Sequence, residues 1–157
     1  MSSKSTATPE NALTREEIDE RLASHALARL ATYRADGMIH LTPIWFDWDG
    51  ERFRLTLGAG RVHLKNLRRD PRVSILVDED PRVTEGLAAG AWSIMARGTA
   101  ALSQDEGLIR EVTLAVMKKA IGPEDAQTYL EPIMAEGRTI VTITPEAWLT
   151  WDYNKVE

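Results

Sequence analysis

Cysteine is absent from this chain of 157 residues, which excludes disulfides, thiolate metal ligands and cysteine nucleophiles. Histidine is scarce: His25, His40 and His63 are the only three, and no two of them have the spacing of a metal-binding pair on one helix. The sequence also lacks a G-x-S-x-G elbow, a Walker loop and a G-x-G-x-x-G fingerprint. We therefore expect no metal site and no catalytic triad.

Long apolar runs and an excess of basic residues are missing as well. No apolar segment approaches the roughly 18 residues that a membrane-spanning helix needs, and the first residues lack the apolar core of a signal peptide. The formal net charge of −5 disfavours a nucleic-acid partner, because binding to phosphates requires a basic surface. These absences predict a cytoplasmic protein that binds neither membranes nor nucleic acid.

What the sequence does contain is a series of short strands with few helices. Thr14 and Glu17 form a capping box that begins a helix over 14–24, and Ser103 and Glu106 predict a second one. Strands are predicted at 26–34, 38–48, 51–57, 72–78, 92–102, 138–144 and 147–153, and further helices at about 61–69, 104–120 and 123–135. This order has no alternation of strand and helix, so it favours a mainly antiparallel sheet or barrel. We expect a loose tail over 1–12 and a single domain over 13–157.

The strand predicted at 38–48 carries large apolar side chains on both faces. Ile39, Leu41 and Trp45 alternate with Ile44, Phe46 and Trp48, so both sets need to be covered. Pro43 removes a backbone donor, which places this segment at a sheet edge or at an interruption. The pattern predicts a barrel interior on one side and a ligand or a partner subunit on the other. The tryptophan pairs at 45 and 48 and at 148 and 151 fit core packing, a flat aromatic ligand or a dimer interface equally well.

A basic segment follows the turn Gly58-Ala59-Gly60. Arg61, Lys65, Arg68 and Arg69 recur at helical spacing and share one face, while Val62, Leu64 and Leu67 can turn toward the core. A helix start behind two glycines offers free backbone N–H groups to an anion. A solvated charged face explains such a run equally well, so the residues alone leave both interpretations open.

Four segments together resemble the pyridoxamine-5′-phosphate-oxidase-like split β-barrel superfamily, and in particular its flavin and deazaflavin oxidoreductase branch. They are HLTPIWFDWDGERF, GAGRVHLKNLRRDPRVSILVD, ARGTAAL and AWLTWDYNK, and the resemblance covers residues 13 to 153. The most specific motifs are T-P-I-W-F at 42–46 and the run from Lys65 to Val73. The resemblance implies an α+β fold that is mainly β, a split barrel of the FMN-binding type with about six to eight antiparallel strands and a few flanking helices.

The same resemblance implies a homodimer with a cofactor at its interface. Thr42, Pro43, Ile44 and Trp45 are then expected along the cofactor's ring system, and the last strand, around 148–153, near the partner's site. The cofactor's phosphate is expected beside Gly60, Arg61, His63 and Lys65. Asn66 is expected behind them. His63 stands where relatives often carry a permanent cation, so its charge depends on pH.

The resemblance also implies that the cofactor rather than a catalytic side chain performs the chemistry. We expect coenzyme F420 as the cofactor, with hydride passing between its deazaflavin ring and a flat, conjugated small-molecule acceptor. The acceptor's pocket is expected from the loop 79–91 and the helices over 104–136. The alternatives are an FMN-dependent oxidase or reductase and a non-catalytic barrel that binds a flavin, haem or similar ligand.

Overall fold

The computed structural model describes residues 8–82 and 90–155. Its helices are α1 (Arg15–Ser24), α2 (Val62–Arg69), α4 (Glu106–Ile121) and α5 (Pro123–Ala135), followed at the end of the chain by a 3₁₀ turn, η1 (Tyr153–Lys155). Its strands are β1 (Leu27–Tyr33), β2 (Ile39–Trp45), β3 (Asp47–Trp48), β4 (Phe53–Gly58), β5 (Arg72–Glu79), β6 (Trp92–Ser103) and β7 (Arg138–Asp152).

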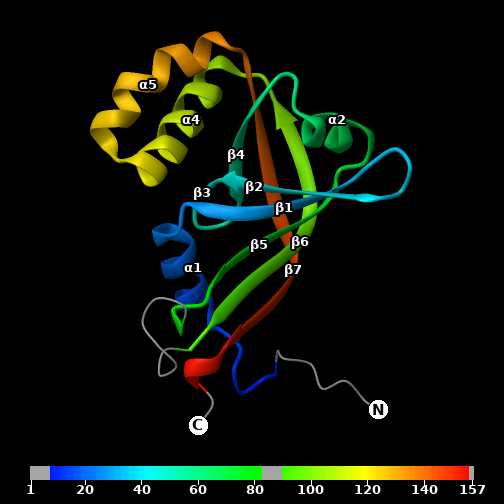
Figure 1. Ribbon diagram of the computed structural model, residues 1–157, viewed down its shortest axis with the longest axis vertical. Helices are drawn as coiled ribbons and strands as arrows, with labels where there is room; N and C mark the ends of the chain where they lie inside the picture. The colour runs from blue at the N-terminus through cyan, green and yellow to red at the C-terminus, as the bar shows by residue number, and fades with distance from the viewer. Residues whose placement is uncertain (1–7, 83–89, 156–157) are drawn as a thin grey trace.

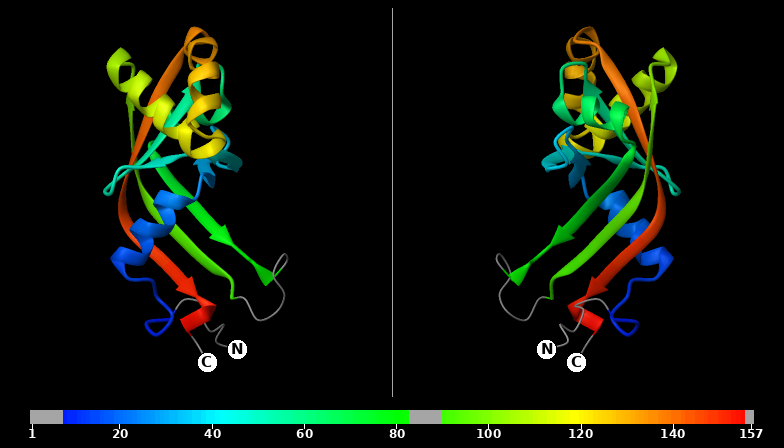
Figure 2. Two further views of the ribbon diagram at one scale, coloured as in Figure 1. Left: turned by 90° about the vertical axis from the view of Figure 1, so that its left-hand side faces the viewer. Right: turned by 90° about the vertical axis from the view of Figure 1, so that its right-hand side faces the viewer.

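The strands form one antiparallel sheet of seven, in the order β2-β1-β5-β6-β7-β4-β3. The sheet curls into a half-barrel around the long strands β6 and β7, with α2 at one side and the hairpin of α4 and α5 at the other (Figure 1). Side views show the curl and place α1 below the hairpin (Figure 2). The α+β split barrel is therefore confirmed, with a strand number inside the expected range.

The core lies on the concave side of this sheet. Phe53, Leu55 and Leu57 alternate along β4 and are almost fully buried, as the sequence pattern predicts for a half-buried strand. Phe46 and Trp48 join them from the next segment, and the Trp48 ring packs edge-on against Trp148 at 5.9 Å between centroids. This pair of tryptophans therefore belongs to the core.

The predicted strand 38–48 is divided at Phe46 into β2 and β3. Among the described strands β2 pairs with β1 alone and is an edge strand. Pro43 lies opposite Arg29 there, which confirms the edge placement predicted from the proline. The interruption falls at Phe46 because its fully buried side chain enters the core, while its backbone N–H donates to Ala26 O at 3.1 Å.

The two closing strands predicted at 138–144 and 147–153 form one continuous strand, β7, so their separation was wrong. The register places Arg97 opposite Ala147 and Gly98 opposite Pro145, which leaves Glu146 as the extra residue of a bulge. The bulge accommodates Pro145, so the strand continues past it. Gly98 is required at this point, because a Cβ there would lie 2.1 Å from Thr144 O.

The capping box predicted from Ser103 and Glu106 was also wrong. The N-cap of α4 is Asp105, whose side chain accepts from the backbone N–H of Leu108 at 2.8 Å, while Ser103 Oγ accepts from Asp105 N. The box predicted at Thr14 is confirmed, with both reciprocal hydrogen bonds formed.

The outer face of the sheet is open over several strands. Successive register partners place Pro43, Arg29, Leu76, Met95 and Leu149 in one row across β2, β1, β5, β6 and β7, and Leu27 lies opposite Trp45 on the same face. This row, together with the pair Leu27 and Trp45 and their neighbours on β2, is called the open face below; its exposed large apolar members are Leu27, Ile39, Leu41, Trp45 and Leu149. Within the described ranges, one side of β2 is partly buried, with Ile44 packed against the core, and the other side, with Ile39 and Leu41, is exposed.

Two predicted segments lie partly outside the described residues. Of the predicted tail 1–12, residues 8–12 are described, and there Asn11 is 3% exposed and its carbonyl accepts from Asp152 N. Most of the predicted loop 79–91 falls outside the described residues.

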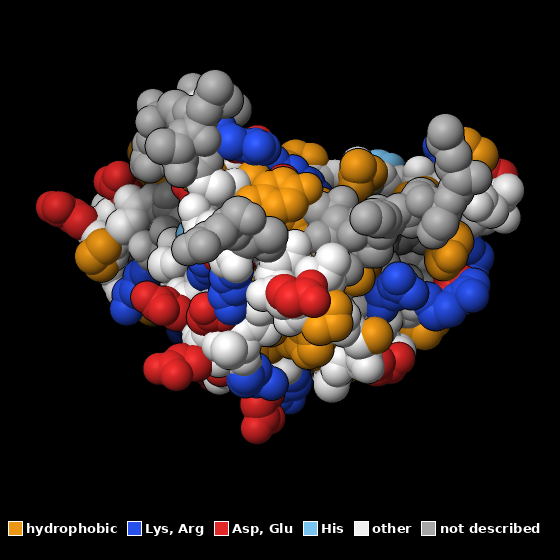
Figure 3. Space-filling view, turned by 90° about the horizontal axis from the view of Figure 1, so that it is seen from below, with side chains coloured by type: hydrophobic (Ala, Val, Ile, Leu, Met, Phe, Trp, Pro, Cys, Tyr) orange, Lys and Arg blue, Asp and Glu red, His pale blue; other side chains and the backbone are white. Residues whose placement is uncertain are grey.

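Among the described residues no helix is long and apolar enough to cross a membrane. Seen from below, the surface carries acidic and basic side chains side by side (Figure 3).

Candidate functional site

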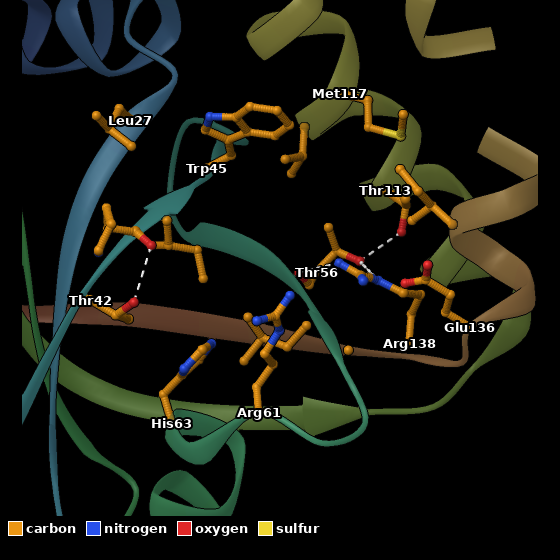
Figure 4. Close-up of a pocket in the computed structure, with 16 residues that line it drawn as sticks. Leu27, Thr42, Trp45, Thr56, Arg61, His63, Thr113, Met117, Glu136 and Arg138 are labelled. Carbon is orange, nitrogen blue, oxygen red and sulfur yellow. Dashed lines mark hydrogen bonds between the residues drawn. The ribbon is translucent and has the colours of Figure 1, made fainter. Parts of the chain in front are cut away.

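A cavity of about 520 Å³ lies between the edge of the half-barrel and the helical hairpin. Its walls come from the end of β2, the end of β4 with the start of α2, the beginning of β7, and the facing sides of α4 and α5. This volume is within the range of small-molecule sites in proteins. The close-up view shows that polar and apolar lining residues occupy different parts of the cavity (Figure 4).

One end of the cavity is cationic. Arg61 is the N-cap of α2 and makes no side-chain capping bond, so the first N–H groups of this helix receive no side-chain acceptor from it. Arg138 comes from β7, and its side chain lies beside that of Arg61 (Figure 4). Neither guanidinium has a carboxylate within salt-bridge distance among the described residues. Two such groups facing one cavity favour an anionic ligand.

Arg138 is held in place by β4. Its Nε donates to Thr56 Oγ1 at 3.1 Å and its Nη2 donates to Thr56 O at 2.8 Å. The Thr56 hydroxyl also bonds the hydroxyl of the fully buried Thr113 on α4, at 2.8 Å. Burial lowers the pKa of Arg138 below its usual value, and the neighbouring Arg61 lowers it further, while Glu136 opposes the shift. The guanidinium is therefore partly desolvated and fixed in orientation before any ligand binds.

Sequence reasoning missed Arg138. It begins a strand about 70 residues after the basic segment, and no local pattern connects the two. The antiparallel pairing of β4 with β7, which sets Gly58 opposite Arg138, brings them together. The available signal was the position of an arginine at the very start of a buried strand.

His63 is a third nitrogen-bearing side chain at this end. Its side chain is 9% exposed, and its ring stacks on that of His40 at 6.0 Å between centroids and 9° between planes. Burial lowers the pKa of His63 below its usual 6.5, and the neighbouring His40 and Arg61 lower it further. The imidazole is therefore neutral at neutral pH.

The other end of the cavity is apolar and partly aromatic. Leu27 and Trp45 come from the sheet and Met117 from α4 (Figure 4), and Val116 of α4 also lines the cavity. Trp45 remains 45% exposed and Leu27 44% exposed, so this end opens toward the open face of the sheet. An apolar slot beside two guanidinium groups fits a ligand with a flat ring at one end and a negative charge at the other.

Six of the predicted site residues line this cavity: Thr42, Pro43, Ile44, Trp45, Arg61 and His63. Gly60, Lys65 and Asn66 do not. Asn66 is buried with its amide bonded to Thr32 Oγ1 at 3.0 Å, which ties α2 to β1, and Lys65 is exposed on the outer side of α2. From the helical region predicted to border the acceptor's pocket, Thr113, Val116, Met117, Ile133 and Glu136 line this cavity.

The basic side chains of the segment 61–69 do not all point into the cavity. Arg61 lines the cavity, whereas Arg69 donates to Tyr33 O at 2.6 Å. Val62, predicted to turn inward, is 50% exposed. Gly60 has no left-handed φ, and a Cβ there would meet nothing within 4 Å, so the structure does not require glycine at this position.

Comparison with known proteins gives the same fold. The family model described as pyridoxamine 5′-phosphate oxidase matches residues 14–152. The conserved hypothetical protein Rv2991 from Mycobacterium tuberculosis is a similar solved structure, with a TM-score of 0.83 and 26% identity over 96% of this chain and 91% of that one. The haem storage protein HutZ from Vibrio cholerae follows with a TM-score of 0.68 and 22% identity, over 87% of this chain and 93% of HutZ. A structure described as an F420 reductase has a TM-score of 0.60 and 22% identity, over 83% of this chain and 94% of that one.

These similar structures are described by different roles, so the shared fold alone does not assign one. The roles have to be distinguished by the geometry of the cavity. Within the described ranges, no cluster of three histidine, aspartate or glutamate side chains is placed to hold a metal ion.

Proposed function

We propose, from the premise that this chain belongs to the pyridoxamine 5′-phosphate oxidase family, that it is an oxidoreductase whose cavity binds a phosphate-bearing, flavin-type cofactor. The observation that carries the proposal is the pairing of Arg61 and Arg138, two guanidinium groups with no salt bridge to any described residue, at one end of a cavity whose other end is apolar.

The lining residues fit such a cofactor. A tricyclic ring fits between Trp45 on the sheet and Met117 on α4, where few polar atoms compete, and a phosphate fits between the two arginines. Backbone groups of β2 at Thr42 and Pro43 border the ring region, because β2 is an edge strand with one side unpaired. Coenzyme F420 and FMN are both candidates, since both carry a ring system and a phosphate. We place F420 first and FMN second.

The bound cofactor supplies hydride-transfer chemistry. The chain's own residues position it and control its surroundings. Arg61 and Arg138 hold the phosphate, Leu27, Trp45 and Met117 exclude water from one side of the ring, and Thr56 with Thr113 keeps the Arg138 guanidinium in place. A flat, conjugated acceptor then stacks on the side of the ring that the chain leaves uncovered.

We further propose that a second copy of this chain covers the open face. Ile39 and Leu41 are 62% and 66% exposed on an edge strand, an arrangement that isolated soluble chains rarely keep. The cavity opens toward the same face through Trp45 and Leu27. A homodimer formed through this face would bury its exposed apolar side chains and close the apolar end of both cavities.

The experiment is an equilibrium titration of the purified protein with F420 and, separately, with FMN. Reduced F420 is then mixed with the protein and a panel of flat conjugated acceptors, and its reoxidation is followed by absorbance. Tight F420 binding, weak FMN binding and protein-dependent reoxidation support the F420 assignment.

The reverse preference assigns FMN and leaves the phosphate site intact. Binding of neither cofactor, or binding of haem in place of both, overturns the proposal. Binding without turnover on any acceptor supports the non-catalytic alternative.

A further inference from the structure

The charged groups that line the cavity do not balance a fully ionised phosphate. They are Arg61 and Arg138, each carrying one positive charge, and Glu136 at the end of α5, carrying one negative charge. Two positive charges and one negative charge leave a net of one positive charge. A phosphate with two esters carries one negative charge, whereas a phosphate with a single ester carries about −1.5 to −2 at pH 7.

His63 is the one group in the cavity that can change this sum near neutral pH. It faces His40 on β2 across a parallel ring contact, and Arg61 precedes it at the start of α2. Arg138 on β7 and Glu136 after α5 line the same cavity. Arg61 and Arg138 are cationic, and His63 itself is 9% exposed. Without a dianion beside it, a proton on His63 meets repulsion and loses hydration.

We propose that His63 determines which phosphate charge the cavity accepts: while its imidazole is neutral, the site favours a phosphodiester monoanion over a phosphomonoester dianion. The inference rests on the proposed function, since it concerns the phosphate of the same cofactor. It also distinguishes the two cofactor candidates on physical grounds, because the phosphate is an internal diester in F420 and a terminal monoester in FMN. A lysine or arginine at position 63 would add the missing positive charge and favour the dianion.

The first test uses three ligands that share one ring and one sugar chain: riboflavin, FMN, and the methyl ester of FMN, which has one negative charge fewer. Dissociation constants are measured at pH 7.5 by quenching of flavin fluorescence. In the wild type, both phosphorylated ligands bind more tightly than riboflavin, and the methyl ester binds at least as tightly as FMN. In His63→Lys, FMN gains about tenfold relative to its methyl ester, as expected for one added charge at a partly desolvated site.

Two control variants separate local from overall charge. His63→Gln keeps the position neutral, and Gln127→Lys adds the same charge at an exposed position of α5 that does not line the cavity. Both are expected to keep the wild-type ratio of FMN to methyl ester affinity. An unchanged ratio in a folded His63→Lys, or an equal change in Gln127→Lys, overturns the inference while leaving phosphate binding intact. If neither phosphorylated ligand binds more tightly than riboflavin, the phosphate site of the proposed function fails instead.

A second measurement does not depend on the folding of His63→Lys. Inorganic sulfate keeps its charge of about −2 throughout the range in which histidine titrates, so its binding to the wild type reports the charge of the protein alone. Sulfate affinity is expected to rise about tenfold from pH 7.5 to pH 5.5 in the wild type and to rise clearly less in His63→Gln. Equal slopes in the two proteins overturn the assignment to His63.

Discussion

Arg138 on β7 and Thr56 on β4 are joined by two hydrogen bonds, at 3.1 Å to the hydroxyl and 2.8 Å to the carbonyl oxygen of the threonine. The threonine is itself anchored to Thr113 on α4. One guanidinium thus connects the sheet, the helical hairpin and the cavity. The arrangement fixes the direction of a charged group that has no carboxylate partner in the described chain, which is the property that an anion site requires.

Arg61 and Lys65 lie one helical turn apart and should differ sharply in importance. Arg61→Gln is expected to weaken binding of the phosphate-bearing cofactor by about 1.5–3 kcal/mol, because it removes a charge-assisted hydrogen bond. Lys65→Gln is expected to change it by less than about twofold, since Lys65 does not line the cavity. Isothermal titration of both variants checks this. An equal loss of affinity in the two variants would show that Lys65 contacts the phosphate, as the sequence motif predicts.

The open face predicts a dimer that a single charge disrupts. Leu41→Asp places a carboxylate on the open face. It is expected to raise the dimer dissociation constant at least about 100-fold, because an unpaired charge is costly to bury. Tyr129→Asp is the matched control, since Tyr129 is also an exposed large side chain, at 53%, but lies on α5. Sedimentation velocity measures both. A wild type that is monomeric at micromolar concentration contradicts the proposed interface.

Gly98 and Gly60 form a second matched pair. Gly98→Ala is expected to destabilise the protein by about 1–3 kcal/mol or to prevent folding, because its Cβ would lie 2.1 Å from Thr144 O at the bulge. Gly60→Ala is expected to leave the free energy of unfolding unchanged or to raise it by about 0.4–1 kcal/mol, since the backbone there is not left-handed and space is free. Urea denaturation checks both variants, and similar losses in the two would contradict the bulge geometry.

Lys119 makes a pH-dependent contribution to stability. Its Nζ lies 3.7 Å from the centre of the Phe46 ring and donates to Leu22 O at 3.0 Å, and burial lowers its pKa from 10.5 to about 8. Between these two values the unfolded chain binds more protons than the folded one. The contribution of Lys119 therefore increases stability as pH rises from about 8 toward 10.5, and is constant below this window.

The measurement is the free energy of unfolding of the wild type and of Lys119→Met from pH 7 to pH 10. Titration of all other groups cancels in the difference, which is expected to shift in favour of the wild type as pH rises. A difference that stays constant across the range would show that Lys119 has an ordinary pKa.

Local patterns in the sequence were sufficient for the half-buried strand β4, the edge position of β2 and the helix cap at Thr14. In each case the cause is local: alternation, a missing N–H, or a side chain that reaches its own helix. Arg138 and the bulge at Glu146 could not be found in this way. Both arise from register between strands far apart in sequence, where β7 meets β4 and β6.

The family motifs had a different limit. They directed attention to a contiguous basic segment, and the structure divides that segment between the cavity, the core and the surface. Arg61 and His63 line the cavity, Asn66 ties α2 to β1, and Lys65 is exposed. The direction in which each side chain points depends on how α2 packs against β1, which sequence spacing alone does not specify.

The most direct test of the cavity as a cofactor site is the affinity of wild type and Arg138→Gln for F420 and for FMN. This substitution removes the one cavity cation that neither the basic segment nor the family motif contains. Whichever cofactor binds the wild type more tightly is predicted to bind Arg138→Gln about 10- to 100-fold more weakly, with folding confirmed by circular dichroism. Unchanged affinity in the folded variant would contradict the assignment of the phosphate to this cavity.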